Sequence, residues 1–217
     1  MVSKFFKDIK IYNKGITLIE LLVVIFIIAM FSLMAISDFP RILRDSALSK
    51  ITHKLSQDLR SVQDMSLSGV LEKDSDDCVL PAKGYGVYFT MNNAGQYLIY
   101  ADVNGDKEYN DDFSYTECSN MQYYYAGCAD RLPGTDYDCV LKVISIIEDN
   151  ASLSIKQITN SVSANYSTTS VNFSPPNPTT TLTADSSNPS DIIVIFKNTD
   201  NSERRVIVNT SGLINVP

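Results

Sequence analysis

The sequence predicts an α+β protein in which one long N-terminal helix precedes an antiparallel β-sheet head. Up to about residue 69, apolar side chains recur at helical spacing, whereas from residue 85 onward they alternate with a period of two. The later runs are short and separated by turns, and the pattern shows no second helix, which is typical of an α+β layout. The expected segments are a basic stretch at 1–15, an apolar helix at 16–39, an amphipathic helix at 40–69 and a β-rich head at 70–217.

Charge divides the 217-residue chain unevenly. Its 18 basic and 25 acidic residues give a net charge of -7, but residues 1–15 hold four lysines and one aspartate. Residues 16–217 therefore hold 14 basic and 24 acidic residues, a net charge of -10. This acidity argues against broad nucleic-acid binding, which depends on neutralising phosphates. With His53 as its one histidine, the chain also offers little for histidine-dependent catalysis, and we predict no enzyme.

Residues 16–35 form an apolar run that contains a single charge, Glu20. At 1.5 Å per residue, the run matches the roughly 30 Å hydrocarbon core of a bilayer. The positive-inside rule keeps the basic segment in the cytoplasm and places the head outside it. A carboxylate within a membrane helix costs about 2.5–3.5 kcal/mol, so Glu20 is either functional or close enough to the interface to reach water.

Residues 14–25, KGITLIELLVVI, resemble the class III prepilin signal of type IV pilins and type II secretion pseudopilins. The shared features are a short basic leader, a junction glycine, an apolar first residue and a glutamate at the fifth mature position. The resemblance implies that prepilin peptidase cleaves between Gly15 and Ile16 and methylates the new amine of Ile16. It also implies that Glu20 pairs with this cationic amine on a neighbouring subunit, which offsets the desolvation of both charges.

The function implied by this resemblance is structural: a minor pilin or pseudopilin in a type IV pilus or a type II secretion-like filament. The implied partners are prepilin peptidase, other pilins or pseudopilins, an assembly platform protein, an ATPase motor, and membrane lipid before assembly. The implied location is the inner membrane, by a single pass, and then an extracytoplasmic filament. An alternative is a binding module at a filament tip, such as a DNA-uptake receptor or an adhesin.

The amphipathic helix is expected to follow Pro40, which should kink or break the chain's helical path. Its apolar stripe faces a sheet, its polar positions include His53, and Ser68-Gly69 provides a plausible stop. The stripe consists of Leu48, Ile51, Leu55, Leu59, Val62 and Met65.

The head should contain short strands, the first two joined as a hairpin by Asn92-Asn93-Ala94-Gly95. Residues 160–190 are rich in Ser, Thr, Asn and Pro, and we expect a surface loop there. The predicted strands are 85–89, 96–100, 122–125, 140–147, 152–158, 170–173, 192–196, 205–208 and 213–216.

The oxygen-bearing side chains at Asp102, Asn104 and Asp106 have the spacing that opens a calcium loop, and Asp112 could close such a site. Lys107 stands where that loop expects glycine. The alternative is an Asx-turn at a hairpin tip with no cofactor. A similar pattern occurs in heads that resemble GspH/FimT-type minor pilins.

The four cysteines, Cys78, Cys118, Cys128 and Cys139, suggest disulfides in an exported head. Four cysteines allow three connectivities, and we favour Cys128–Cys139 with Cys78–Cys118 because a turn-rich segment separates the first pair. The zinc alternative lacks any C-x-x-C spacing.

Arg204-Arg205 lies between the two final predicted strands. FimT-like minor pilins are thought to bind DNA through basic residues in this region, so the pair is a candidate DNA-binding site. The competing interpretation is a charged hairpin edge that discourages edge-to-edge pairing.

Overall fold

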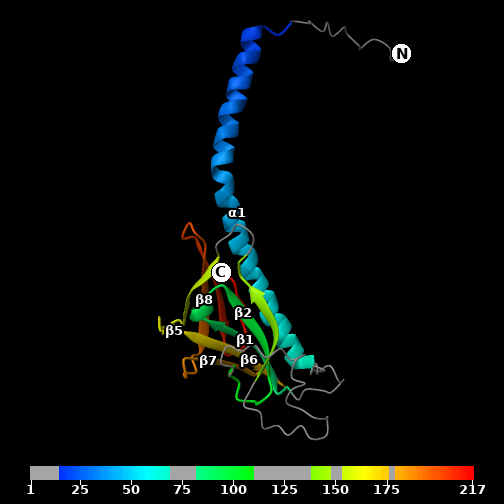
Figure 1. Ribbon diagram of the computed structural model, residues 1–217, viewed down its shortest axis with the longest axis vertical. Coiled ribbons are helices and arrows are strands. Elements are labelled where there is room, and N and C mark those ends of the chain that lie inside the picture. Colours follow the sequence, from blue (N-terminus) through cyan, green and yellow to red (C-terminus); the bar gives the residue numbers. More distant parts are fainter. Residues whose placement is uncertain (1–14, 69–81, 110–137, 148–152, 176–178) are drawn as a thin grey trace, which may run out of the picture. The chain divides into compact units, whose positions relative to one another are not determined.

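The computed structural model describes residues 15–68, 82–109, 138–147, 153–175 and 179–217, except the side chains of residues 35, 37 and 38. It has one long N-terminal helix, α1 (Leu18–Ser68), and two antiparallel β-sheets, which confirms the predicted α+β class (Figure 1). The chain divides into two compact units, Met1–Ile42 and Leu43–Pro217, which we call the anchor unit and the head unit.

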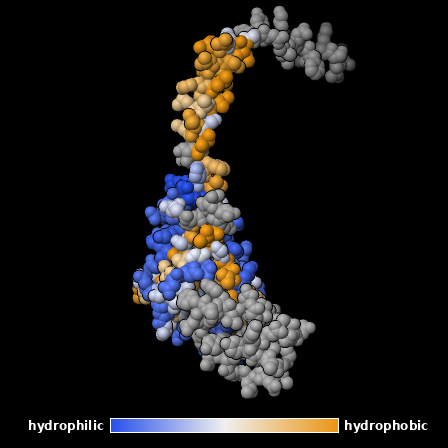
Figure 2. All heavy atoms as spheres, viewed as in Figure 1, coloured by the Kyte–Doolittle hydropathy of each residue, from blue (hydrophilic) through white to orange (hydrophobic). Residues whose placement is uncertain are grey.

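In the anchor unit, α1 is apolar on all sides and exposed. Leu18 is 81 % exposed and Ile25 58 %, and α1 contains a window long and apolar enough to cross a membrane. Figure 2 shows this part of the helix as mostly orange, the colour of hydrophobic residues. A helix that is apolar all round needs a lipid or protein environment, because exposing its apolar surface to water is unfavourable in free energy.

Pro40 lies inside α1, so of the two expected outcomes, a kink or a break, the break does not occur, and the kink stays a prediction. A proline inside a helix removes one backbone hydrogen bond and costs roughly 3 kcal/mol. The long helical flanks on both sides offset this cost, because the sequence before and after Pro40 favours helix. The predicted boundary at 39/40 is therefore not a helix end, and the compact units divide after Ile42.

In the head unit, the predicted apolar stripe of α1 is buried. Leu48, Ile51, Leu55, Leu59 and Val62 are each at most 1 % exposed, and Met65 packs against them. Among the polar positions between them, His53, Gln57, Arg60 and Asp64 are exposed, whereas Thr52 and Ser56 are buried. The stripe joins residues from both sheets in one core, so this part of α1 contributes to the folding of the head.

Within the described residues, the strands form two five-stranded sheets. The first sheet has the order β3-β2-β1-β6-β7 and the second has the order β10-β9-β8-β4-β5. The strands are β1 (Gly84–Thr90), β2 (Gln96–Asp102), β3 (Cys139–Ser145), β4 (Ser154–Thr159), β5 (Asn165–Tyr166), β6 (Thr168–Ser174), β7 (Thr179–Ala184), β8 (Asp191–Lys197), β9 (Glu203–Asn209) and β10 (Ile214–Asn215).

The predicted hairpin is confirmed, since β1 pairs antiparallel with β2 across a short 3-10 helix, Met91–Asn93. The expected surface loop over 160–190 is wrong, because β6 and β7 lie within it. Threonine is β-branched and favours strands, and in β7 Leu182 and Ala184 alternate into the core between threonines. The predicted strand at 122–125 lies outside the described residues.

The first sheet carries a second, smaller core on its outer face. Tyr88, Tyr100 and Tyr109 pack there, with ring centroids 4.9 Å apart for Tyr88–Tyr109 and 5.2 Å for Tyr100–Tyr109. Tyr100 pairs in register with Gly86 and lies across it, so that a Cβ at position 86 would come 2.4 Å from the ring. Glycine is thus the residue that admits this ring.

Candidate functional site

The predicted cleavage junction lies just before the start of α1. Gly15 and Ile16 are exposed and outside the helix, and nothing lies within 4 Å of where a Cβ at Gly15 would be. An accessible, non-helical junction is what a peptidase requires to bind a chain in extended form. The cleavage and methylation sites remain predictions.

Thr17 caps the helix. Its carbonyl oxygen accepts a hydrogen bond from the Leu21 N–H at 3.2 Å, and its Oγ1 accepts one from the Glu20 N–H at 3.3 Å. The first is the opening intrahelical bond, and the second satisfies one of the N–H groups that a helix start leaves without an intrahelical partner. The sequence already carries a signal for this role, because Thr17-x-x-Glu20 is a capping-box signature.

Glu20 occupies the third position of the helix, one turn from the junction, and its side chain is exposed in the single chain. A carboxylate in the first turn interacts favourably with the positive end of the helix dipole. Its exposed position leaves it accessible to a cation on another chain. Pairing with the amine of a neighbouring subunit stays a prediction.

Ser32 is a polar side chain in the middle of the exposed apolar helix. Its Oγ donates a hydrogen bond to the Ile28 carbonyl oxygen at 2.8 Å, one turn earlier. The hydroxyl is therefore satisfied within the helix and needs no water. Because of this bond, the helix around Ser32 can lie in an apolar environment without an unsatisfied hydroxyl.

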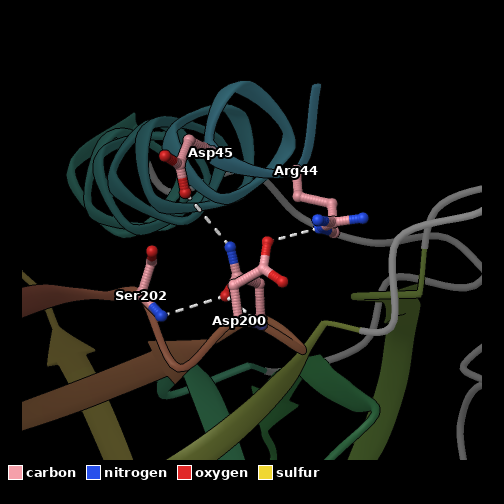
Figure 3. Close-up of polar contacts among 5 residues, drawn as sticks. Arg44, Asp45, Asp200 and Ser202 are labelled. Carbon is pink, nitrogen blue, oxygen red and sulfur yellow. Dashed lines mark hydrogen bonds and ion pairs between the residues drawn. The ribbon is translucent and has the colours of Figure 1, made fainter. Parts of the chain in front are cut away.

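Within the head unit, Arg44 and Asp45 of α1 contact the turn between β8 and β9 (Figure 3). Arg44 forms an ion pair with Asp200, and the Asp45 carboxylate accepts a hydrogen bond from the Asn198 amide at 3.2 Å. The Asn198 Oδ1 also accepts bonds from the backbone N–H groups of Asp200 and Ser202, at 2.9 and 3.0 Å. We call these contacts the helix latch.

Two further bonds tie α1 to the first sheet. The buried Tyr97 hydroxyl donates to the Asp58 carboxylate at 2.6 Å, and the Ser66 hydroxyl donates to the Phe173 carbonyl oxygen at 2.8 Å. Burial, with the Asp58 hydrogen bond and charge, raises the pKa of Tyr97 well above its usual value. The tyrosine therefore stays a neutral donor, and the head part of α1 is bound to both sheets.

The Asp102 loop contains two residues with left-handed backbone conformation, and backbone N–H groups point at its first carboxylate. Gly105 and Lys107 have positive φ angles of 85° and 71°, so Lys107 adopts the conformation for which a calcium loop uses glycine. The Asp102 carboxylate accepts bonds from the N–H groups of Gly105 and Lys107, at 2.5 and 3.1 Å, and from the Asn172 amide at 3.1 Å. Burial raises the pKa of Asp102, although these bonds oppose it.

Nested Asx-turns account for the remaining polar groups of this loop. Asn104 accepts a bond from the Asp106 N–H at 3.0 Å, and Asp106 accepts one from the Glu108 N–H at 2.9 Å. Among the described residues, no group of three His, Cys, Asp or Glu side chains could hold a metal ion. Asp112 lies outside those residues, and calcium binding stays a prediction.

The Asp102 loop crosses the first sheet. The Tyr109 N–H donates to the Ser170 hydroxyl on β6 at 3.1 Å, and the Thr183 hydroxyl on β7 donates to the Lys107 carbonyl oxygen at 3.4 Å. With the Tyr109 ring packed on the sheet, residues 103–109 cover part of its outer face. Within the described chain, the loop thus has a clear structural role.

The remaining sequence candidates lie elsewhere. Cys139 is fully buried and disulfide-bonded, but Cys78, Cys118 and Cys128 lie outside the described residues, so the pairing stays a prediction. Arg204 and Arg205 lie on β9 and are exposed. They belong to the head unit, whereas Glu20 belongs to the anchor unit.

Comparison with known families identifies the N-terminal segment. Residues 11–36 match the family model of the prokaryotic N-terminal methylation motif. Comparison with curated proteins and with solved structures found no match. The motif spans the Gly15–Ile16 junction, Thr17 and Glu20, and it supports a type IV pilin-like or pseudopilin precursor that prepilin peptidase processes. The arrangement of one long helix and antiparallel sheets is pilin-like. The expected similarity of the head to GspH/FimT-type minor pilins is not shown.

Proposed function

We propose that the chain is a structural subunit, a minor pilin or pseudopilin, of a type IV pilus or type II secretion-like filament. One observation carries the proposal: the methylation motif includes the start of a helix that is exposed and apolar on all sides in the anchor unit and amphipathic in the head unit. The anchor part needs an apolar environment from outside the chain. Lipid supplies it before assembly, and neighbouring helices supply it in a filament.

The polar groups at the helix start fit this role. Cleavage after Gly15 creates an amine at Ile16 that is mostly cationic at neutral pH, before and after methylation. Glu20 of one subunit pairs with this amine on the next, which compensates a carboxylate that costs about 2.5–3.5 kcal/mol when isolated in a membrane. Such a pair also sets the axial register between subunits.

The test is the Glu20→Ala variant of the full chain, expressed with its own assembly machinery. Leader removal, measured by N-terminal mass spectrometry, should be unchanged, whereas incorporation into sheared filaments should fall to background. Asp64→Ala is the matched control, because Asp64 is an exposed carboxylate on the head part of the same helix. Normal incorporation of Glu20→Ala would refute the pairing mechanism.

A binding module at the filament tip is the alternative, with Arg204 and Arg205 as its DNA-binding candidates. The excess of acidic over basic residues in 16–217 disfavours it, because DNA would meet a repulsive field over most of the molecule. A gel-shift assay with the full chain in detergent discriminates the two functions. Salt-sensitive retardation that is lost in Arg204→Ala/Arg205→Ala would support the alternative.

A further inference from the structure

The Asp102 loop contains the one Asn-Gly pair of the sequence, Asn104-Gly105. An asparagine before glycine is prone to deamidation, because glycine has no side chain to hinder the approach of its backbone nitrogen to the preceding amide. Asn104 and Gly105 are half-buried and the next residue, Asp106, is exposed, so water reaches this part of the loop. The pair therefore lies where this reaction is chemically possible.

The peptide group that joins Asn104 to Gly105 lies between opposite charges. Its carbonyl oxygen, which belongs to Asn104, accepts a hydrogen bond from the Lys83 ammonium at 2.7 Å. Its N–H, which belongs to Gly105, donates to the Asp102 carboxylate at 2.5 Å. Both Asp102 oxygens accept hydrogen bonds, as those of an ionised carboxylate do. One end of this peptide group thus contacts a cation and the other an anion.

These two charges act on the reaction in opposite directions. Deamidation requires the Gly105 nitrogen to lose its proton, and the negative charge that results is shared with the Asn104 carbonyl oxygen. The Lys83 ammonium stabilises this anion, whereas the Asp102 carboxylate repels it and holds the proton in a hydrogen bond. A carboxylate is too weak a base to remove this proton itself.

The Asn104 side chain is restrained as well. Its Oδ1 accepts a hydrogen bond from the Asp106 N–H at 3.0 Å, and its Nδ2 donates one to the Asp106 carboxylate at 2.9 Å. These bonds tie the amide to Asp106 and limit how freely its carbon can turn toward the Gly105 nitrogen. Conversion of the amide to a carboxylate would remove the Nδ2 donor and place two carboxylates next to each other.

We propose that Asn104 is a deamidation site whose rate is raised by Lys83 and lowered by Asp102. The Gly105 nitrogen loses its proton to solvent and forms a bond to the Asn104 Cγ, while the Cγ–Nδ2 bond breaks and Nδ2 leaves as ammonia. Water then adds to the resulting succinimide and opens it to aspartate or isoaspartate. The new carboxylate repels that of Asp106, so the loop loses part of its attachment to the first sheet. This site does not depend on filament assembly.

The experiment is timed incubation of the purified full chain in detergent at mildly alkaline pH, followed by peptide mapping with mass spectrometry. We expect the mass change from amide to acid at Asn104 sooner than at the other described asparagines, with isoaspartate among the products. In water enriched in heavy oxygen, the new carboxyl group should carry the label, which identifies conversion that occurs during the incubation. Conversion of Asn104 that is no faster than that of the other described asparagines would overturn the proposal.

Two variants separate control by charge from loss of fold. Lys83→Met should slow conversion by about threefold to tenfold, because it removes an exposed ammonium that stabilises the anion. Asp102→Asn should speed conversion by about tenfold, because it removes the charge that opposes the anion. Loss of fold alone would speed conversion in both variants. Lys142→Met is the matched control, because Lys142 is an exposed lysine on β3 of the same sheet, and it should leave the rate unchanged.

Thermal unfolding verifies that each variant is folded. If Asp102→Asn does not fold, Lys83→Met and Lys83→Arg decide the test, because arginine keeps the positive charge and should retain most of the rate. An unchanged rate in Lys83→Met would overturn the proposal. A change in the same direction in folded Lys83→Met and folded Asp102→Asn would overturn it as well.

Discussion

The two parts of α1 differ in where their apolar side chains find partners. In the head unit, Leu55 and Leu59 are fully buried against both sheets. In the anchor unit, Leu22 and Ile25 are 56 % and 58 % exposed, although they belong to the same helix. One part is therefore stabilised by its own chain, and the other depends on lipid or on other chains. This difference separates folding of the head from assembly of the subunit.

The largest expected effect comes from truncating a buried leucine. Leu55→Ala should lower the free energy of unfolding of the head by about 2–5 kcal/mol, because it removes apolar contacts and leaves a cavity. Leu22→Ala, the same change in the exposed part, should leave head unfolding unchanged. Denaturant unfolding of the full chain in detergent measures both. Equal effects of the two substitutions would contradict the division between folding and assembly.

A smaller effect is expected from the hydrogen bond between α1 and the first sheet. Tyr97→Phe keeps the ring but removes the hydroxyl that donates to Asp58, and should cost about 0.5–1.5 kcal/mol of head stability. The same denaturant titration measures this loss. Combining it with Asp58→Asn in a double-mutant cycle checks the mechanism, since additive losses would show that the two groups are not coupled.

The cap at Thr17 provides a comparable but local effect in the anchor unit. Thr17→Ala removes the Oγ1 acceptor and should destabilise the first helical turn by about 1 kcal/mol. Hydrogen exchange of residues 18–21 in detergent should become faster, while head stability stays constant. Thr17→Ser, which keeps the hydroxyl, is the control, and faster exchange in both variants would argue against the cap.

The smallest effect is expected at the helix latch. Arg44 and Asp200 have side chains about one-third exposed, so breaking their ion pair with Arg44→Met should cost less than about 1 kcal/mol. The loss should shrink further at high salt. Arg60→Met, which changes an exposed arginine of the same helix, is the control. An effect as large as that of Leu55→Ala would mean that polar contacts dominate the docking of α1.

Much of this division was predictable from residue spacing. Apolar runs and periodic stripes are local patterns, so they predict the apolar part of α1, the buried stripe and most strands. The effect of Pro40 depends on its long helical flanks, which keep the helix continuous through this residue. The composition of residues 160–190 is typical of a loop, but the alternation of Leu182 and Ala184 with threonines favours a strand.

Other features depend on pairing between distant residues. The division into two sheets follows from strand order, and the helix latch joins residues more than 150 positions apart in sequence. The Asp102 loop was identified by its spacing, but its path across the first sheet depends on Ser170 and Thr183. For the candidate site, the motif at Gly15, Ile16 and Glu20 is local and can be recognised in the sequence, whereas the helix latch depends on contacts that only the fold supplies.

The fit of the Tyr100 ring over Gly86 has an evolutionary consequence. Because a side chain at position 86 would enter the space of that ring, the two positions are not free to vary independently. A sequence that gains a larger residue at position 86 must also lose bulk at position 100, and the order of the two changes matters. Shrinking the tyrosine first leaves a void, whereas enlarging the glycine first creates a clash. Homologues should therefore show paired substitutions at positions 86 and 100. The intermediate sequences should keep glycine at position 86 and carry a residue smaller than tyrosine at position 100.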